Sequence, residues 1–212
     1  MAGEKKVQKR TLESREKLLN AAYQLFAEKG YYNTNTKEIA RSAGISVGNF
    51  YNYYEDKAGI YAELVRQYTD TSRENLKILL DELLKKMDRI KNLEDVIDAV
   101  DDYANQQLGR AEVSGILFKD AYLIQRDHIV LDQIMKESEL KLVAVLEEFL
   151  MKCPNIQRRA SYPVMARMLF VMGDTISIDV MRTRDRDFFE EYRREMSTVL
   201  AEYVFGAGWK KD

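Results

Sequence analysis

The chain has 212 residues, enough for one large or two small domains, and 46% of them are hydrophobic, which suffices for a sizeable core. Its 33 Lys and Arg and 35 Asp and Glu give a net charge of −2, so the chain is not uniformly basic. The charge is unevenly divided, since residues 1–60 hold ten basic and seven acidic side chains and the remainder holds 23 and 28. The first 60 residues are therefore the basic part of the chain.

The cysteine content and the lengths of the apolar runs indicate the compartment. Cys153 is the only cysteine, so no disulfide and no cluster of thiolate metal ligands can form within one chain. No apolar run near the start is long enough for a secretion signal, and none elsewhere reaches the roughly 18 residues that a membrane helix needs. We therefore expect a cytoplasmic protein that is neither exported nor membrane-spanning.

The first predicted helix runs from about Ser14 to Lys29 and ends at Gly30. One side of it carries the apolar residues Leu18, Leu19, Ala22, Leu25 and Phe26. Four basic residues precede it: Lys5, Lys6, Lys9 and Arg10. They can form an arm that neutralises phosphates or a solvated, disordered leader, and the sequence leaves both open.

Residues 36–57 predict two short helices joined by a sharp turn. Asn35 and Glu38 have the spacing of a capping box, which places the start of the first helix near Thr36. Gly44 tolerates the left-handed conformation that ends a helix, and Ser46 is suited to cap a second helix of about two turns. This is the layout of a helix-turn-helix, whose second helix fits the major groove of DNA.

The same segment resembles the TetR family of bacterial transcriptional regulators over roughly residues 12 to 62. The residues that carry the resemblance are Ile39-Ala40, Ala43-Gly44-Ile45-Ser46, Gly48, Tyr51-Asn52-Tyr53-Tyr54 and Lys57. Tyr53 stands where His is common in that family, Tyr54 stands where Phe is common, and Val47 stands where several members carry a basic residue. A pair of core helices joined by a glycine turn is the alternative, and the number of matching positions disfavours it.

The resemblance implies a set of DNA contacts. Phosphate contacts are expected from Thr36, Ser46, Tyr51, Tyr53 and Lys57. Val47, Asn49 and Asn52 are expected to face bases, where an Asn amide pairs well with the edge of adenine. Gly48 would allow close approach of the backbone, and Phe50 is expected to anchor the helix in the core.

The rest of the chain predicts helices only. Only Pro154 and Pro163 interrupt it, and apolar residues recur at spacings of three and four. The expected helices cover about residues 56–87, 93–108, 115–125, 128–152, 157–182 and 188–205. We predict an all-α fold in which a three-helix DNA-binding head, residues 12–62, joins a larger helical domain for ligand binding and dimerisation, residues 63–212.

The last two expected helices are candidates for a homodimer interface. Between Val164 and Met181 apolar residues surround most of the helix, so it must be buried on more than one side. The resemblance implies a symmetric four-helix interface with contributions from Met165, Phe189, Tyr192, Met196, Val199, Leu200 and Tyr203. An entirely intramolecular core is the alternative.

A ligand pocket is expected between helices of the larger domain, largely because the resemblance implies one. Its candidate lining residues are Tyr103, Phe118, Tyr122, Met135, Met168 and Met172. Each of these is also an ordinary core residue. Asp120 and Asp174 could meet a cationic or hydroxylated ligand, or lie at a surface or interface.

Enzymatic and metal sites have little support. The chain has no phosphate-cradling GxxxxGK loop, and Gly206 and Gly208 fit a helix stop and tail. His128, the only histidine, could join Asp127 and Asp132 at a metal, but an ordinary histidine near a helix start is favoured. We expect no cofactor, no metal and no enzymatic activity.

The sequence thus predicts a sequence-specific transcriptional regulator. A homodimer would read a palindromic operator on double-stranded DNA and act as a repressor that a small-molecule effector releases. Two alternatives stay open at this point. One is a DNA-binding protein without ligand control, and the other is a helical enzyme or adaptor that keeps a helix-turn-helix for packing.

Overall fold

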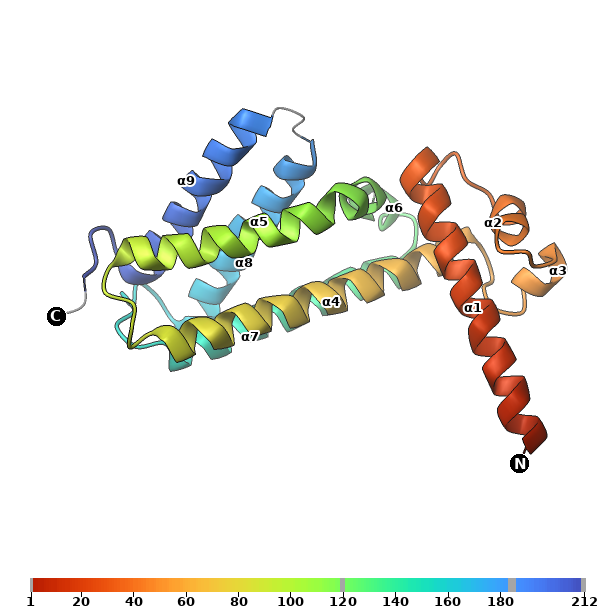
Figure 1. The fold of residues 1–212 in the computed structure, drawn as a ribbon, viewed down its shortest axis with the longest axis horizontal. Helices are drawn as coiled ribbons and strands as arrows, with labels where there is room; N and C mark the ends of the chain where they lie inside the picture. The colour runs from red at the N-terminus through yellow and green to blue at the C-terminus, as the bar shows by residue number, and fades with distance from the viewer. Residues whose placement is uncertain (1, 119–120, 183–185, 211–212) are drawn as a thin grey trace. The chain divides into compact units, whose positions relative to one another are not determined.

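The computed structural model describes residues 2–118, 121–182 and 186–210, except for the side chains of residues 2–10, 106–118, 176–182, 186, 187 and 189. Over these ranges the regular structure is helical apart from one isolated antiparallel bridge between Asn92 and Lys210 (Figure 1). The helices are α1 Ala2–Lys29, α2 Thr36–Ser42, α3 Val47–Phe50, α4 Lys57–Lys86, α5 Leu93–Phe118, α6 Ala121–Ile124, α7 Ile129–Lys152, α8 Tyr162–Arg182 and α9 Arg186–Phe205. The predicted all-α class is confirmed.

The chain forms two compact units, which we call the head and the body. The head comprises Met1–Tyr68 and Val113–Met135, and the body comprises Thr69–Glu112 and Lys136–Asp212. Compared with the predicted division at residues 62 and 63, the head thus gains the segment that holds α6 and the start of α7. The helices α4, α5 and α7 each contribute residues to both units.

The head has its own core, formed by α1 to α4 with α6 and the start of α7. Its fully buried side chains include Leu18, Phe26, Ile39, Phe50, Ile60, Tyr61, Ile124 and Leu131. The ring of Tyr61 lies 5.4 Å from that of Phe26 and 4.9 Å from that of Tyr31. These contacts fix the helices that carry the polar face described below.

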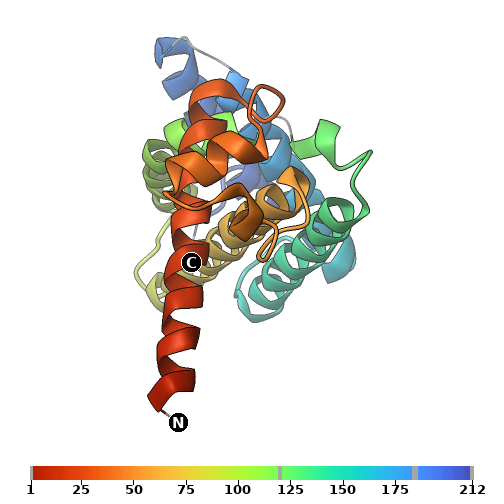
Figure 2. The same cartoon turned by 90° about the vertical axis from the view of Figure 1, so that its right-hand side faces the viewer.

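The first helix is longer than its sequence indicates. It ends as predicted, because Gly30 has a φ of 81° and its N–H donates to the carbonyl of Phe26 at 2.9 Å. It begins at Ala2 rather than near Ser14, so the basic residues at its start belong to a helix and not to an irregular leader. Figures 1 and 2 both show this N-terminal part of α1 extending past α2 and α3.

The body is built around a second core from α4, α5, α7, α8 and α9. Its buried side chains include Leu80, Leu83, Val96, Ile97, Leu150, Met165, Ala166, Leu169 and Val204. Ion pairs join α9 to α5, since Arg193 contacts Asp101 at 2.8 Å and Arg194 contacts Asp98 at 2.7 Å. The chain end returns to the start of α5, where Leu93 N–H donates to the carbonyl of Trp209 at 3.0 Å.

Two predicted helix boundaries beyond the helix-turn-helix were wrong. Helix α5 runs from Leu93 to Phe118 without the predicted break at Gly109 and Gly115. A glycine inside a helix costs only about 1 kcal/mol, which the rest of a long helix offsets. Helix α8 begins at Tyr162 rather than Gln157, and Gln157 N–H donates to the carbonyl of Val204 at 2.7 Å.

Candidate nucleic-acid interface

Local side-chain chemistry fixes the start of α2. The Oδ1 of Asn35 accepts from Glu38 N–H at 3.0 Å, and Asn35 N–H donates to the Oε2 of Glu38 at 3.4 Å. This reciprocal pair is the predicted capping box, and α2 begins at Thr36 as expected. Ile39 and Ala40 are fully buried, so α2 packs into the head on that side.

The turn between α2 and α3 also has the predicted geometry. Gly44 has a φ of 67°, and the following Ile45 N–H donates to the carbonyl of Ala40 at 2.9 Å. Ser46 caps α3, because its Oγ accepts from Asn49 N–H at 3.2 Å. Helix α3 is a single turn, Val47–Phe50, and the predicted second turn is replaced by a tight turn over residues 51–53. Phe50 is fully buried and anchors the segment.

Two polar pairs lie on the outer side of the helix-turn-helix. The Oγ1 of Thr36 lies 3.2 Å from the hydroxyl of Tyr51, which is 54% exposed. The Nδ2 of Asn52 donates to the Oδ1 of Asn49 at 3.0 Å. Four of the predicted contact residues are thus joined in pairs at the surface.

Gly48, in the same short helix α3, faces open space. A Cβ at this position would meet no atom within 4 Å. Packing within the described head therefore does not require glycine here, and the backbone of α3 is accessible to a molecule that approaches from outside.

Two other predicted contact residues are turned partly inward. Val47 and Tyr53 are half-buried and pack against the head core. Ser46 is exposed but its Oγ already serves the cap of α3. Fewer of the predicted contact residues therefore offer a free polar group at the surface than the sequence indicated.

Lys57, the first residue of α4, is anchored within the head. Its Nζ donates to the carbonyl of Tyr31 at 2.7 Å and lies 4.1 Å from the centre of the Tyr31 ring. Lys57 is half-buried, and this burial lowers the pKa of its ammonium. One of its three N–H donors is thus engaged inside the protein, and the other two are available to a phosphate.

Tyr54 explains one departure from the family pattern. Its hydroxyl donates to the Oε2 of Glu63 at 2.8 Å, and Arg15 contacts the same oxygen at 2.7 Å. Burial, together with the Glu63 carboxylate, raises the pKa of Tyr54. The hydroxyl that a phenylalanine would lack therefore links the segment after α3 to α4, and through Glu63 to Arg15 of α1.

The sequence interpretation missed two basic residues on α2. Lys37 and Arg41 are exposed and stand four residues apart, on the same side of the helix. The buried Ile39 and Ala40 mark the opposite side. A spacing of four between basic residues in the first helix of the motif was the signal that could have identified them.

The predicted ligand residues are distributed between the two units. Tyr122 is exposed and Met135 packs on the core of the head. Tyr103 is half-buried in the body, Met168 is exposed on α8, and Met172 packs on the body core. The side chain of Phe118 and all of Asp120 lie outside the described residues, and Asp174 is half-buried. Ligand binding by these residues stays a prediction.

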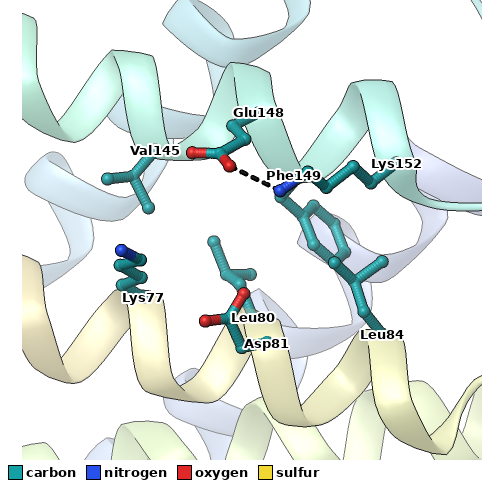
Figure 3. Close-up of a pocket in the computed structure, with 8 residues that line it drawn as sticks. All are labelled: Lys77, Leu80, Asp81, Leu84, Val145, Glu148, Phe149 and Lys152. Atoms are coloured by element: carbon teal, nitrogen blue, oxygen red, sulfur yellow. Dashed lines mark hydrogen bonds and ion pairs between the residues drawn. The ribbon is translucent and has the colours of Figure 1, made fainter.

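A small hollow in the body lies between α4 and α7 (Figure 3). It is lined by Lys77, Leu80, Asp81, Leu84, Val145, Glu148, Phe149 and Lys152. Its volume of about 10 Å³ matches a single water molecule. The ion pair between Lys152 Nζ and Glu148 Oε1, at 2.5 Å, lies at its rim. This hollow cannot hold an organic effector.

The predicted interface residues have different environments. Met165 is a correction, because its side chain is fully buried in the body core and has no surface left for a partner. Leu200 and Tyr203 also pack on that core, Tyr192 and Met196 are half-buried, and Val199 is exposed. Phe189 lies outside the described side chains. Among the described side chains of α8, the large exposed apolar ones are instead Val164, Met168 and Val171.

The described part of the chain offers no metal site and no activated cysteine. No group of three or more His, Cys, Asp or Glu there could hold a metal ion, and the Nε2 of His128 lies 3.5 Å from the Tyr31 hydroxyl. Cys153 is buried, and this burial raises the pKa of its thiol to about 12. Among the described helices, none combines the length and apolar character required to span a bilayer.

Comparison of the sequence with known proteins places the motif in a family. Residues 18–64 match the model for bacterial regulatory proteins of the tetR family. The chain is 27% identical over 128 residues to the uncharacterized helix-turn-helix transcriptional regulator YdgC of Bacillus subtilis (strain 168), covering 60% of this chain and 64% of that protein. It is 26% identical over 141 residues to the regulator HbdR of Aromatoleum sp. (strain CIB), covering 66% and 58%. The chain thus spans less than two thirds of the length of these relatives.

Solved structures share the fold over nearly the whole chain. A TetR-family regulator from Mesorhizobium loti has a TM-score of 0.71 at 19% identity, covering 92% of this chain and 98% of that one. Thermus thermophilus FadR, a TetR-family repressor in complex with lauroyl-CoA, has a TM-score of 0.58 at 19% identity, covering 93% and 97%. Residues 18–64 thus carry a helix-turn-helix of the tetR family, and the chain as a whole shares the fold of TetR-family regulators.

Proposed function

We propose that the protein binds double-stranded DNA in a sequence-specific way through α2, the turn at Gly44 and α3. The observation that carries this proposal is the surface of the motif, which presents two polar side-chain pairs and a glycine with open space at its Cβ position. A buried Phe50 and two capped helix starts hold these groups in place from behind. Lys37 and Arg41 add positive charge for phosphates on the same motif.

The acting species is a homodimer that joins through the body. Val164, Met168 and Val171 recur at spacings of four and three on α8, so they form one apolar stripe, and 44–52% of each remains exposed in the single chain. Helix α9 lies beside α8 and adds the exposed Val199 and Phe188. A symmetric contact between two copies would cover both helices, as a two-fold interface uses the same surface twice.

A dimer of this kind reads a palindrome. Two heads bind half-sites about 34–36 Å apart along the DNA, so that each α3 enters the same face of the duplex. The protein acts as a repressor, and a small molecule releases it by binding more tightly to the state whose heads do not fit the operator. Helix α4 contributes residues to both units and is the element through which such a change would pass.

The solved structures provide a first class of candidate effectors to test. Thermus thermophilus FadR and Bacillus subtilis FadR were solved with lauroyl-CoA and stearoyl-CoA, and both share the fold of this chain at 18–19% identity. This likeness concerns the fold, so it selects long-chain acyl-CoA as a probe and does not identify the effector.

Selection of bound sequences from a random DNA pool tests the proposal. The expected result is a palindrome whose half-sites are one helical turn, or a multiple of it, apart. Binding that is equally strong to every sequence, or no binding to DNA at low salt, would reject the proposal. A selected operator then allows acyl-CoA to be tested for release of the protein from that DNA.

A further inference from the structure

Asn49 and Asn52 are not two independent side chains. The Nδ2 of Asn52 donates to the Oδ1 of Asn49 at 3.0 Å, and Asn52 N–H donates to the carbonyl of Asn49 at 3.2 Å. Asn49 is itself held by the cap of α3, because its N–H donates to the Oγ of Ser46 at 3.2 Å. The orientation of the Asn52 amide therefore depends on Asn49, and that of Asn49 on the start of α3.

The bond between the two amides leaves them with different hydrogen-bonding groups available to DNA. A primary amide has two N–H donors and one acceptor oxygen. Asn52 uses one donor on Asn49, so its second donor and its oxygen remain available. Asn49 uses one of the two lone pairs of its oxygen on Asn52, so a bidentate contact of its own with a base would have to share that oxygen with Asn52.

Adenine requires the groups that Asn52 retains. In the major groove adenine offers N7 as an acceptor and the N6 amino group as a donor, and one amide satisfies both. Guanine offers two acceptors at the same edge, so the oxygen of Asn52 would face another oxygen there. The arrangement thus favours adenine over guanine opposite Asn52.

We propose that Asn52 reads a single adenine in each half-site and that Asn49 is a positioning residue that holds the Asn52 amide in its reading orientation. This inference rests on the proposed function, because it assumes that the outer side of α3 faces the major groove. It replaces the expectation that Asn49 and Asn52 each read a base of their own. Two independent readers would produce two base preferences, whereas the coupled pair produces one.

Binding-site selection on four proteins separates these possibilities: the wild type, Asn52→Ala, Asn49→Ala and the double variant. We expect the wild type to select adenine at one position of each half-site and Asn52→Ala to lower that preference by about tenfold. Asn49→Ala should lower the preference at the same position by a smaller factor, and the double variant should match Asn52→Ala. Both residues lie at the surface of the head, and circular dichroism confirms that each variant is folded.

Two further measurements distinguish positioning from a general loss of binding. Asn49→Asp keeps an acceptor oxygen for Asn52, so it should retain the adenine preference although its added negative charge weakens binding to every sequence. Replacing the selected adenine by 7-deazaadenine removes N7, which should weaken the wild type and leave Asn52→Ala unaffected.

Several results would overturn the inference. Asn49→Ala could remove the preference at a different position, the two single effects could add in the double variant, or the selected half-site could have no adenine that depends on Asn52. Each of these leaves DNA binding intact and rejects only the pairing of Asn49 with Asn52. A wild-type protein that selects no sequence at all rejects the proposed function as well, so the two failures are distinguishable.

Discussion

The head and the body differ in how their candidate functional residues are held. In the head, polar side chains such as Asn49, Asn52 and Tyr51 are joined in defined pairs, and buried residues fix them from behind. In the body, the candidate residues are apolar and share their environment with an ordinary core, and some of them remain exposed. The difference shows that hydrogen-bonding chemistry marks a site more sharply than apolar character does. If the proposed roles are right, variants in the body should change association and variants in the head should change stability or DNA binding.

The largest effect is expected from charge on the exposed stripe of α8. Met168→Asp together with Val171→Asp places carboxylates in the proposed interface without entering the core, since both side chains are 44–45% exposed. The dimer should dissociate, because burying unpaired charges is costly, and affinity for a full operator should fall by about a hundredfold or more. Sedimentation at micromolar concentration measures the association state.

A control for this variant lies on another helix of the body. Lys141→Asp changes charge at an exposed position of α7, outside the stripe of α8. It should leave the dimer intact. A wild-type monomer, or a doubly charged variant that remains a dimer, would remove α8 from the proposed interface.

The next largest effect is expected for Lys57, which is anchored within the head and is also a predicted phosphate contact. Lys57→Ala removes a charged hydrogen bond to the Tyr31 carbonyl and the contact with the Tyr31 ring, so the free energy of unfolding should fall by about 2 kcal/mol. Lys57→Met keeps the stem over the ring and should lose less. Denaturant titration measures both values.

The salt dependence of DNA binding shows whether Lys57 also reaches a phosphate. If it does, the slope of log K against log salt falls by about one unit in Lys57→Ala. A slope equal to that of the wild type, with the expected loss of stability, would show that Lys57 only anchors the head.

A pH dependence of the head follows from Tyr31. Burial raises its pKa to about 12, and Asp56 and Tyr32 contribute in the same direction. The folded state therefore holds the proton more tightly than the unfolded state, so this stability is complete below pH ~10 and is lost as the pH rises toward 12. We expect the wild type to lose up to about 2 kcal/mol in this window and Tyr31→Phe to lose less. Denaturant titrations at pH 9 and about pH 11.5 compare the two proteins.

The smallest effects are expected on the exposed side of the motif. Tyr51→Phe removes a hydroxyl, and Lys37→Ala and Arg41→Ala each remove a charge from an exposed position. Each should weaken operator binding by about 1 kcal/mol or less and leave the base preference unchanged, because phosphate contacts carry no sequence information. Only the two basic residues should lower the salt slope. Altered base preference in any of the three would show that it had been assigned to the wrong part of the DNA.

The sequence predicted the parts of the head that depend on neighbouring residues. The Asn35 and Glu38 box, the turn at Gly44 and the Ser46 cap each involve residues within five positions of one another, where spacing determines the contact. The anchoring of Lys57 by Tyr31 joins residues far apart in the chain, so spacing gave no indication of it. The same holds for Tyr54 and Glu63 with Arg15.

The body was less predictable because apolar patterns do not identify the buried side. The helix around Met165 is apolar nearly all round, so the sequence could not show that Met165 is buried while Val164 and Met168 are exposed. Glycine was also misleading, since Gly109 and Gly115 lie within an uninterrupted α5. In both cases packing against other helices decided the outcome, and this packing is not encoded at a fixed spacing.

The single cysteine of the chain offers a direct view of the body in solution. Cys153 is 7% exposed, and its pKa near 12 leaves almost no thiolate at neutral pH, so a thiol reagent can react only when the surrounding helices open. A compound that binds the closed body shifts this opening equilibrium and slows labelling in proportion to its occupancy. Candidate effectors can therefore be ranked by the rate at which one sulfur is modified, with no DNA in the assay and before any operator is known.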